Sequence, residues 1–358
     1  MRILFAICFL FCITTTSLAA EQATVVYDGA VLSEDATWRG SVLVNGYVVV
    51  APHATLRIEP GTIIRFAATA AQQLPSLIVQ GRIQAVGTPE QPIILSSGRT
   101  TPVRGSWGGV VFLSTEKRNL LEQCRIEYAE TGIDVRSSTV ALKDVSIVKA
   151  RTALLSHDGV VQITGGLVSE AETGIEIYNS EFDGRDTAVT SCQSGFVLKK
   201  SAVVLTSLKI ANNVNIGLEA EDCRIKITGG EFSGNGLGAR IKGGEGQMVQ
   251  SRFHKNRLTA LHLIGAQIKI QRCLFLENLQ DALRTEDGGA LLLNNGFSSN
   301  GGYNLYNAGH EAVSARLNWW GTVDPVLIEQ KISGANRDKN SGGADVFPWL
   351  REKPPLMP

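Results

Sequence analysis

The chain has 358 residues, with 34 Lys and Arg against 34 Asp and Glu, so its formal net charge is zero. Nucleic acid and anionic membranes both attract proteins with a basic excess, so this balance argues against either as the main partner. Hydrophobic residues make up 44% of the sequence. No segment after residue 20 is apolar for long enough to predict a membrane helix, so no membrane span is expected in the mature chain.

Residues 1–19 are predicted to be a signal peptide. Arg2 supplies the positive end, residues 3–13 form an apolar run too short to span a bilayer, and Ser17-Leu18-Ala19 fits a small-x-small cleavage site. We therefore expect an exported protein in the periplasm, at the cell surface or outside the cell. The cysteines left after cleavage occupy different positions in the repeat described below, so we expect mostly buried free thiols at Cys124, Cys192, Cys223 and Cys273.

Residues 20–117 read as an N-terminal cap followed by irregular first coils. Short β-rich runs such as 42–44, 56–58 and 63–66 alternate with Gly and Pro. Nothing in this segment resembles a linker. We therefore expect it to continue the structure predicted for the rest of the chain.

Residues 118–317 repeat every 21 or 22 residues, which is typical of a solenoid. The anchor is a small residue or Asn followed by an apolar one. It recurs at Gly132-Ile133, Ala153-Leu154, Gly174-Ile175, Gly195-Phe196, Gly217-Leu218, Gly238-Ala239, Ala260-Leu261, Ala282-Leu283 and Asn304-Leu305. A second apolar column lies seven or eight residues before each anchor.

Within each repeat, apolar residues alternate with polar ones, as in Ile133-Asp134-Val135 and Leu261-His262-Leu263. A period of two predicts strands, and no repeat contains an amphipathic run long enough for a helix. The sequence therefore predicts an all-β, parallel β-helix with three short strands per coil. Each apolar column would become an interior stack with neighbouring coils about 4.8 Å apart.

An Asn column supports this prediction. Four or five residues before each apolar anchor, the later repeats place an Asn in register, at Asn213, Asn235, Asn256, Asn278 and Asn300. An Asn at the same bend of successive coils can adopt the left-handed conformation and hydrogen bond its neighbours above and below. We therefore predict a structural Asn ladder.

Residues 318–350 are predicted to be a C-terminal cap. Asp324 is a good N-cap and Pro325 suits the first turn, so one short helix is expected to run from here to Ser333-Gly334. A polar loop over 336–343 and the segment 346–350 would then fold back over the last coil. Residues 351–358 form a tail, whose final part from Pro354-Pro355 is expected to be disordered.

Several of these segments resemble exported bacterial right-handed parallel β-helix repeat proteins, which have the pectin-lyase-like fold. The resemblance rests on 37–40, 56–64, 79–81 and 85–88 for the first coils, and on Asn318-Trp319-Trp320-Gly321 for an Asn-x-Trp-Gly cap. It implies the architecture for nearly the whole mature chain. The family includes polysaccharide lyases, hydrolases and carbohydrate-associated surface proteins, so the resemblance does not decide the activity.

One outward column is the candidate ligand-binding site. The residue that follows the apolar anchor is polar in five consecutive repeats, at Glu219, Arg240, His262, Arg284 and Tyr306. A stripe of Arg, His and Tyr can hold sugar carboxylates and can also serve acid–base elimination. The alternative is a solvated strand face whose neighbouring charges compensate one another.

The motifs of known enzymes with this fold are missing. The Asn-Thr-Asp, Asp-Asp and Gly-His-Gly segments of its inverting glycosidases do not occur, nor does the Arg-x-Pro-x-x-Arg of pectate lyases. A calcium loop at Asp338 and Asn340 is rejected, because glycine replaces one ligand and Trp349 replaces the closing Glu. We predict no catalytic residue, metal or cofactor.

Two functions remain open. The preferred one is an exported, non-catalytic carbohydrate-binding or envelope-associated module, with a polysaccharide or another cell-envelope component as its partner. The alternative is a polysaccharide lyase or glycoside hydrolase of an unrecognised family that uses Arg240, His262 and Arg284.

Overall fold

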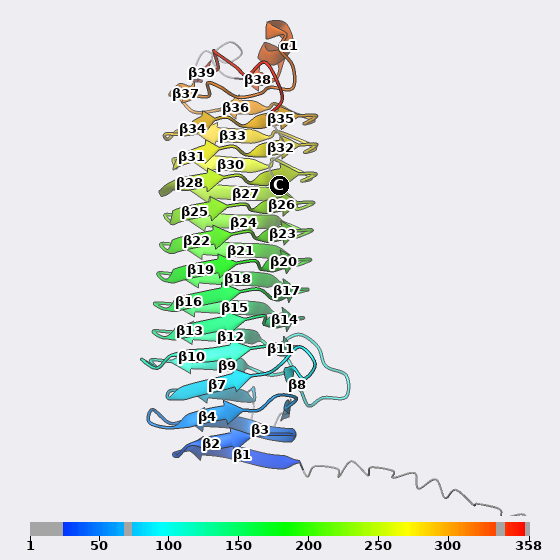
Figure 1. Ribbon diagram of the computed structural model, residues 1–358, viewed down its shortest axis with the longest axis vertical. Coiled ribbons are helices and arrows are strands. Elements are labelled where there is room, and N and C mark those ends of the chain that lie inside the picture. Colours follow the sequence, from blue (N-terminus) through cyan, green and yellow to red (C-terminus); the bar gives the residue numbers. More distant parts are fainter. Residues whose placement is uncertain (1–23, 68–73, 334–340, 355–358) are drawn as a thin grey trace, which may run out of the picture.

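The structure, a computed structural model, describes residues 24–67, 74–333 and 341–354. It confirms the predicted parallel β-helix. The strands stack into an elongated rod whose coils follow one another along the long axis (Figure 1). The predicted signal peptide and the first part of the loop over 336–343 lie outside the described residues.

Each regular coil has three strands, which we assign to faces 1, 2 and 3 in chain order. The two long strands of the first coils, β1 (Val25–Leu32) and β3 (Ser41–Val50), run along faces 1 and 2 without a break. The first half of β3 pairs with β5 and its second half pairs with β6. Faces 1 and 2 consequently form one continuous sheet of 25 strands, whereas face 3 is a separate sheet of 14 strands.

The remaining strands follow this order. Face 1 consists of β5 (Ile63–Ala67), β8 (Ile93–Ser97), β11 (Cys124–Glu127), β14 (Ser146–Val148), β17 (Leu167–Ser169), β20 (Ala188–Thr190), β23 (Lys209–Ala211), β26 (Glu231–Ser233), β29 (Arg252–His254), β32 (Leu274–Leu276) and β35 (Gly296–Ser298). Face 2 consists of β6 (Ser76–Val79), β9 (Gly109–Leu113), β12 (Thr131–Arg136), β15 (Thr152–His157), β18 (Thr173–Tyr178), β21 (Ser194–Lys199), β24 (Ile216–Glu221), β27 (Leu237–Lys242), β30 (Leu261–Ile264), β33 (Leu283–Glu286), β36 (Leu305–Asn307) and β38 (Ile332–Ser333). Face 3 consists of β2 (Ala36–Trp38), β4 (Thr55–Ile58), β7 (Arg82–Val86), β10 (Asn119–Glu122), β13 (Thr139–Lys143), β16 (Val160–Thr164), β19 (Glu181–Arg185), β22 (Ala202–Thr206), β25 (Arg224–Thr228), β28 (Glu245–Val249), β31 (Gln267–Gln271), β34 (Leu291–Leu293), β37 (Val313–Ser314) and β39 (Ala344–Asp345).

The predicted interior stacks are confirmed. Ile133 pairs with Leu154 and Leu154 with Ile175 on adjacent strands of face 2, and all three side chains are fully buried. Alternation turns every second side chain of these strands inward, so each coil adds one more layer to a continuous apolar core.

The anchor requires a small residue for steric reasons. A Cβ atom at Gly195 would lie 2.3 Å from the carbonyl oxygen of Gly217 in the next coil, and one at Gly217 would lie 2.5 Å from that of Gly238. The backbones of successive coils approach too closely at these two glycines for a larger side chain.

The corners of the coil differ from the prediction in one respect. From β11 to β36 each bend contains a residue with positive φ, but between faces 1 and 2 this is the residue before the ladder Asn rather than the Asn itself. Asn212 (φ 58°), Lys255 (φ 55°) and Glu277 (φ 53°) adopt the left-handed conformation. The ladder side chains thereby point inward while the strained position stays at the surface.

The Asn side chains of this corner hydrogen bond along the rod axis. In the middle of the column, the backbone N–H of Asn235 donates to Oδ1 of Asn256 at 3.1 Å, and Nδ2 of Asn256 donates to Oδ1 of Asn278 at 2.9 Å. The column ends where Nδ2 of Asn300 donates to Oδ1 of Asn304. All of these side chains are buried, so the bonds satisfy polar groups that water does not reach.

A second, shorter Asn pair lies at the corner between faces 3 and 1 and is absent from the sequence-based predictions. The backbone N–H and Nδ2 of Asn295 both donate to Oδ1 of Asn318. Asn318 donates in turn to the carbonyls of Leu292 and Ala315. The spacing of Cys273, Asn295 and Asn318, one coil apart in sequence, is the signal that could have revealed this pair.

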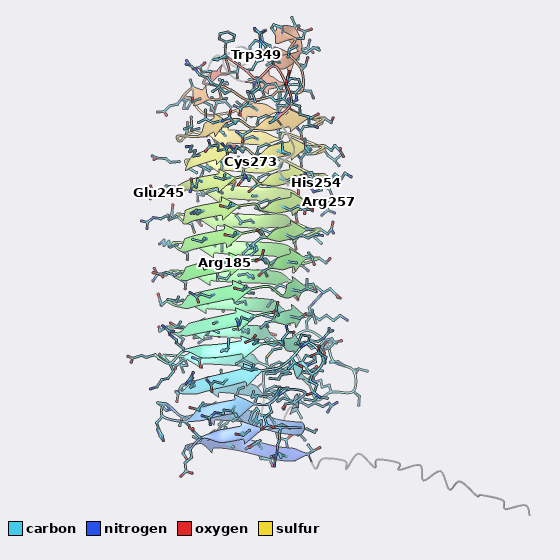
Figure 2. The ribbon with its side chains drawn as sticks, viewed as in Figure 1. Arg185, Glu245, His254, Arg257, Cys273 and Trp349 are labelled. Atoms are coloured by element: carbon cyan, nitrogen blue, oxygen red, sulfur yellow. The ribbon has the colours of Figure 1, made fainter. Side chains whose placement is uncertain are left out.

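The C-terminal segment contains the predicted short helix, α1 (Pro325–Gln330), and Oδ1 of its N-cap Asp324 accepts the backbone N–H of Val326 at 2.9 Å. It is shorter than predicted, because Lys331 is the C-cap and strand β38 begins at Ile332. Trp349 lies at the C-terminal end of the rod (Figure 2), and the backbone N–H of Leu350 donates to the carbonyl of Asn318.

The described part of the predicted tail, 351–354, contacts the rod. Pro354 lies over face 1, where a Cβ atom at Gly296 would be 3.3 Å from its Cγ. A glycine on the outer side of β35 leaves the space that this contact requires.

Candidate functional site

The five predicted ligand-binding residues lie in one line on the outside of face 2. Their register is continuous, because Glu219 pairs with Arg240, Arg240 with His262, His262 with Arg284 and Arg284 with Tyr306 on β24, β27, β30, β33 and β36. Each residue follows a buried anchor, so strand alternation turns it outward. The structure therefore brings all five together on consecutive coils.

Three of the five also line a surface hollow of about 380 Å³. Glu219, Arg240 and His262 contribute to it, whereas Arg284 and Tyr306 lie beyond it toward the C-terminal end. The hollow adds charged residues that sequence reasoning missed, namely Lys199, Glu221 and Lys242. They occupy the next outward position, two residues after the first column, and the same alternation could have identified them.

Carboxylates accompany the cations of this surface. Arg240 Nη1 lies 3.2 Å from Glu219 Oε1, and both side chains are about 40% exposed. Lys242 Nζ lies 2.9 Å from Glu221 Oε1. Exposed pairs of this kind contribute little to stability, so a ligand can displace one partner at small cost.

Toward the C-terminal end, Glu286 joins two residues of the stripe. Its Oε1 lies 3.0 Å from Nε2 of His262 and 3.0 Å from Nε of Arg284. Arg284 also lies over the ring of Tyr306, with its Cζ 4.8 Å from the ring centroid. The guanidinium of Arg284 is thus held by a carboxylate in its own strand and by an aromatic ring in the next coil.

Burial and neighbouring charges shift the pKa values of His262 and Glu286. Partial burial lowers the pKa of His262, and the charges of Arg284 and Arg240 act in the same direction, against the hydrogen bond with Glu286. For Glu286, partial burial opposes ionisation, but hydrogen bonds from Arg284 and His262 outweigh it and lower the pKa. At neutral pH His262 is therefore a neutral imidazole beside an ionised carboxylate.

This arrangement predicts a specific titration. We expect the His262 imidazole to titrate below its ordinary pKa of about 6.5, and Glu286→Gln to lower that pKa further, because it removes a group that favours the protonated ring. The ring-proton signals of wild type and variant, followed against pH by NMR, measure both pKa values.

The same shift makes stability depend on pH. The His262 ring is protonated at higher pH in the unfolded chain than in the folded one, so its protonation favours unfolding as the pH falls below about 6.5. A wild-type pKa at or above 6.5 would contradict the assigned environment.

Other candidate chemistry is sparse in the described part of the chain. Within it, no group of three or more His, Cys, Asp or Glu side chains is placed to hold a metal ion. The four cysteines among the described residues are buried and free, and burial raises the pKa of the Cys124 and Cys273 thiols to about 12. No described helix combines the length and apolar character that crossing a membrane requires.

Two family models match the sequence. The model of a pectate-lyase-like beta helix domain matches residues 29–134, and the model of a right-handed beta helix region matches residues 165–319. No curated protein matches the chain.

Solved structures with a similar chain path include the periplasmic alginate epimerase AlgG, with 11% identity over 74% of this chain and 73% of that one, at a TM-score of 0.44. The A-module of the Azotobacter vinelandii mannuronan C-5 epimerase AlgE6 has 11% identity over 93% of this chain and 91% of that one, at a TM-score of 0.41. Pectate lyase Pel9A has 13% identity over 85% and 71%, at a TM-score of 0.34. At these identities and TM-scores the similarity carries no information on activity. The two family matches and the described fold show that this chain is a right-handed parallel β-helix repeat protein with the pectate-lyase-like fold.

Proposed function

We propose that this protein is an exported, non-catalytic module that binds an acidic polysaccharide of the cell envelope along face 2. The observation that carries the proposal is the unbroken line of Glu219, Arg240, His262, Arg284 and Tyr306 on five successive coils. Coils about 4.8 Å apart place these groups over a span of about 19 Å. A linear polymer that lies along the rod axis can contact several of them at once.

The electrostatics favour weak, cumulative binding. In the hollow, Arg240, Lys199 and Lys242 face Glu219 and Glu221, so the cations exceed the carboxylates by one. A carboxylate of the polymer can share the guanidinium of Arg240 or Arg284 in place of the protein's own partner. Each contact is screened by salt, but contacts on one chain reinforce one another through their high effective concentration.

The acid–base properties of Glu221 and Glu286 suit binding. A glycosidase needs one carboxyl group that stays protonated to act as the general acid, which requires a raised pKa. Here the hydrogen bond and charge of Lys242 lower the pKa of Glu221, and Arg284 and His262 lower that of Glu286. Both groups are thus favoured as carboxylates that hold cations in place.

Binding to a panel of polysaccharides tests this function. In affinity gel electrophoresis with polygalacturonate, polymannuronate and a neutral glucan, we expect the acidic polymers to retard the protein and the retardation to weaken as salt increases. Arg240→Ala and Arg284→Ala are each expected to reduce the affinity about fivefold or more, because each removes one charged hydrogen-bond donor.

Arg224→Ala is the matched control. Arg224 is also an exposed arginine paired with a carboxylate one coil away, Glu245, but it lies on face 3. Its replacement should leave the retardation unchanged. Release of unsaturated or reducing-end products that is lost in His262→Ala would instead establish the lyase or hydrolase alternative, and equal retardation of all variants would exclude face 2 as the binding surface.

A further inference from the structure

A second hollow, of about 530 Å³, lies where the C-terminal segment 350–354 crosses the corner between faces 3 and 1. Three coils form one wall and the C-terminal segment forms the other. This volume is within the range of sites that bind small molecules, about 300–1,000 Å³. The hollow is separate from face 2 and shares no residue with the stripe.

The outward column of face 1 shapes this hollow. Arg252 pairs with Leu274 and Leu274 with Gly296 on successive strands. The side chain at this outward position therefore becomes smaller in each coil toward the C-terminal end of the rod. The missing side chain at Gly296 admits Pro354. Leu274, which is only 8% exposed, and Pro354 give the hollow an apolar surface.

The cations around this hollow have no carboxylate partner in the part of the chain that the structure describes. Arg252 stands opposite Glu231 in the preceding coil, but Glu231 Oε1 is already 3.2 Å from Nε2 of His254 and 3.1 Å from the hydroxyl of Ser233. Across the described residues, no ion pair involves Arg252, Arg272 or Lys353. This distinguishes them from Arg240 and Arg284 on face 2.

Arg272 belongs to the column of positive-φ residues at the corner between faces 3 and 1. With a φ of 55°, it lies between Gln250 and Asn294, which also have positive φ and are uncharged. Its guanidinium therefore has no acidic neighbour in that column. Glu352 is the one carboxylate among the described residues that line the hollow, where Arg252, Arg272 and Lys353 are the cations.

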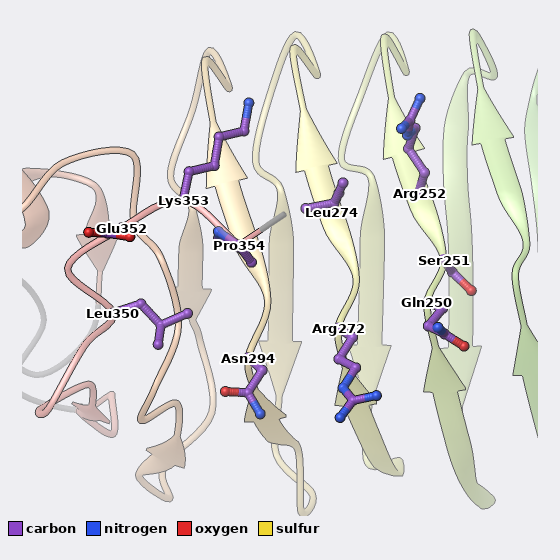
Figure 3. A pocket seen from close by; sticks show the side chains of 10 residues that line it. All are labelled: Gln250, Ser251, Arg252, Arg272, Leu274, Asn294, Leu350, Glu352, Lys353 and Pro354. Carbon is purple, nitrogen blue, oxygen red and sulfur yellow. The ribbon is translucent and has the colours of Figure 1, made fainter. Parts of the chain in front are cut away.

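The cations lie on two sides of the apolar surface. Figure 3 shows Arg272 and Asn294 on one side of the hollow and Arg252 and Lys353 on the other, with Leu274 and Pro354 between them. Guanidinium groups bind carboxylates through paired, charge-assisted hydrogen bonds. We propose that this hollow binds a small organic dianion whose two anionic groups are separated by an apolar or sugar-ring middle.

Isothermal titration calorimetry on the full chain tests this site. The dianions adipate and digalacturonate serve as probes, with hexanoate and cellobiose as the singly charged and neutral counterparts. We expect at least one dianion to bind more tightly than its counterpart. Arg252→Gln and Arg272→Gln are each expected to weaken that binding by about fivefold or more, and Lys353→Ala to weaken it less, because lysine offers no paired donors.

Two controls keep the outcome interpretable. Arg224→Gln should leave the affinity for the dianion unchanged, and circular dichroism should show that all variants keep the strand signal, since the replaced side chains are exposed. Arg240→Ala with Arg284→Ala should leave the affinity for adipate unchanged. The proposal is overturned if neither dianion binds, if hexanoate and cellobiose bind as tightly, if Arg252→Gln and Arg272→Gln bind like wild type, or if only the face 2 variants lose binding.

Discussion

Replacing Asn256 by alanine is expected to lower the free energy of unfolding by about 3–5 kcal/mol. The Oδ1 of Asn256 accepts the backbone N–H of Asn235 at 3.1 Å and its Nδ2 at 3.2 Å. The Nδ2 of Asn256 donates to the carbonyl of Phe232 at 3.0 Å and to Oδ1 of Asn278 at 2.9 Å. Alanine removes all four bonds at a fully buried position and takes away the acceptor of the Asn235 backbone N–H, which water does not replace there.

Equilibrium urea unfolding followed by circular dichroism measures this loss. Asn215→Ala is the matched control, because Asn215 lies at the same corner but is exposed, and it should change stability by no more than about 0.5 kcal/mol. Because repeat arrays can unfold in segments, hydrogen exchange in β26, β29 and β32 should locate the effect at the altered coil. Equal unfolding midpoints for the two variants would show that the ladder contributes no stability.

Phe253→Ala is expected to cost about 3–5 kcal/mol for a different reason, the loss of packing in the apolar core. The Phe253 ring is fully buried between Phe232 and Phe275, with centroid distances of 4.4 and 5.0 Å and nearly parallel planes. The column continues through Phe297 to Trp320. Alanine would leave a cavity of ring size that neighbouring coils, fixed by their own strand pairing, cannot close.

The same urea experiment distinguishes the size of the cavity from the loss of aromatic stacking. Phe253→Leu keeps most of the apolar volume and should cost about 1.5 kcal/mol. Phe347→Ala serves as the surface control, since Phe347 is 67% exposed. A stability of Phe253→Ala within 1 kcal/mol of this control would mean that the coils relax to fill the space.

The Asn ladder, the aromatic column and the face 2 stripe occupy overlapping coils. Asn213 and Asn300 lie at the corners that precede β24 and β36, which carry the first and last residues of the stripe. Hydrogen bonds along one corner and stacked rings inside the tube both oppose changes in coil spacing. We expect this region to be the most rigid part of the rod, which suits a surface that contacts a repeating ligand at fixed intervals.

Much of the fold could be predicted from the sequence, because a solenoid repeats one local pattern. The 21- or 22-residue spacing and the period of two placed Ile133, Leu154 and Ile175 in one interior column, and pairing of equivalent residues on parallel strands then requires them to stack. The same reasoning placed Glu219 to Tyr306 on one outward line. The short helix after Asp324 followed from N-cap and first-turn preferences alone.

Only the tertiary structure decided how these side chains combine. Repeat spacing gives a residue its coil and face, but the partner of a long side chain depends on rotamers and on neighbours in other coils. Arg284 accordingly binds Glu286 of its own strand, and Arg240 binds Glu219 of the preceding coil. The contact of Pro354 with Gly296 joins residues far apart in sequence, so no local pattern predicts it. The hollow beside it exists for the same reason, since it forms only where a non-repeating segment crosses a repeating surface.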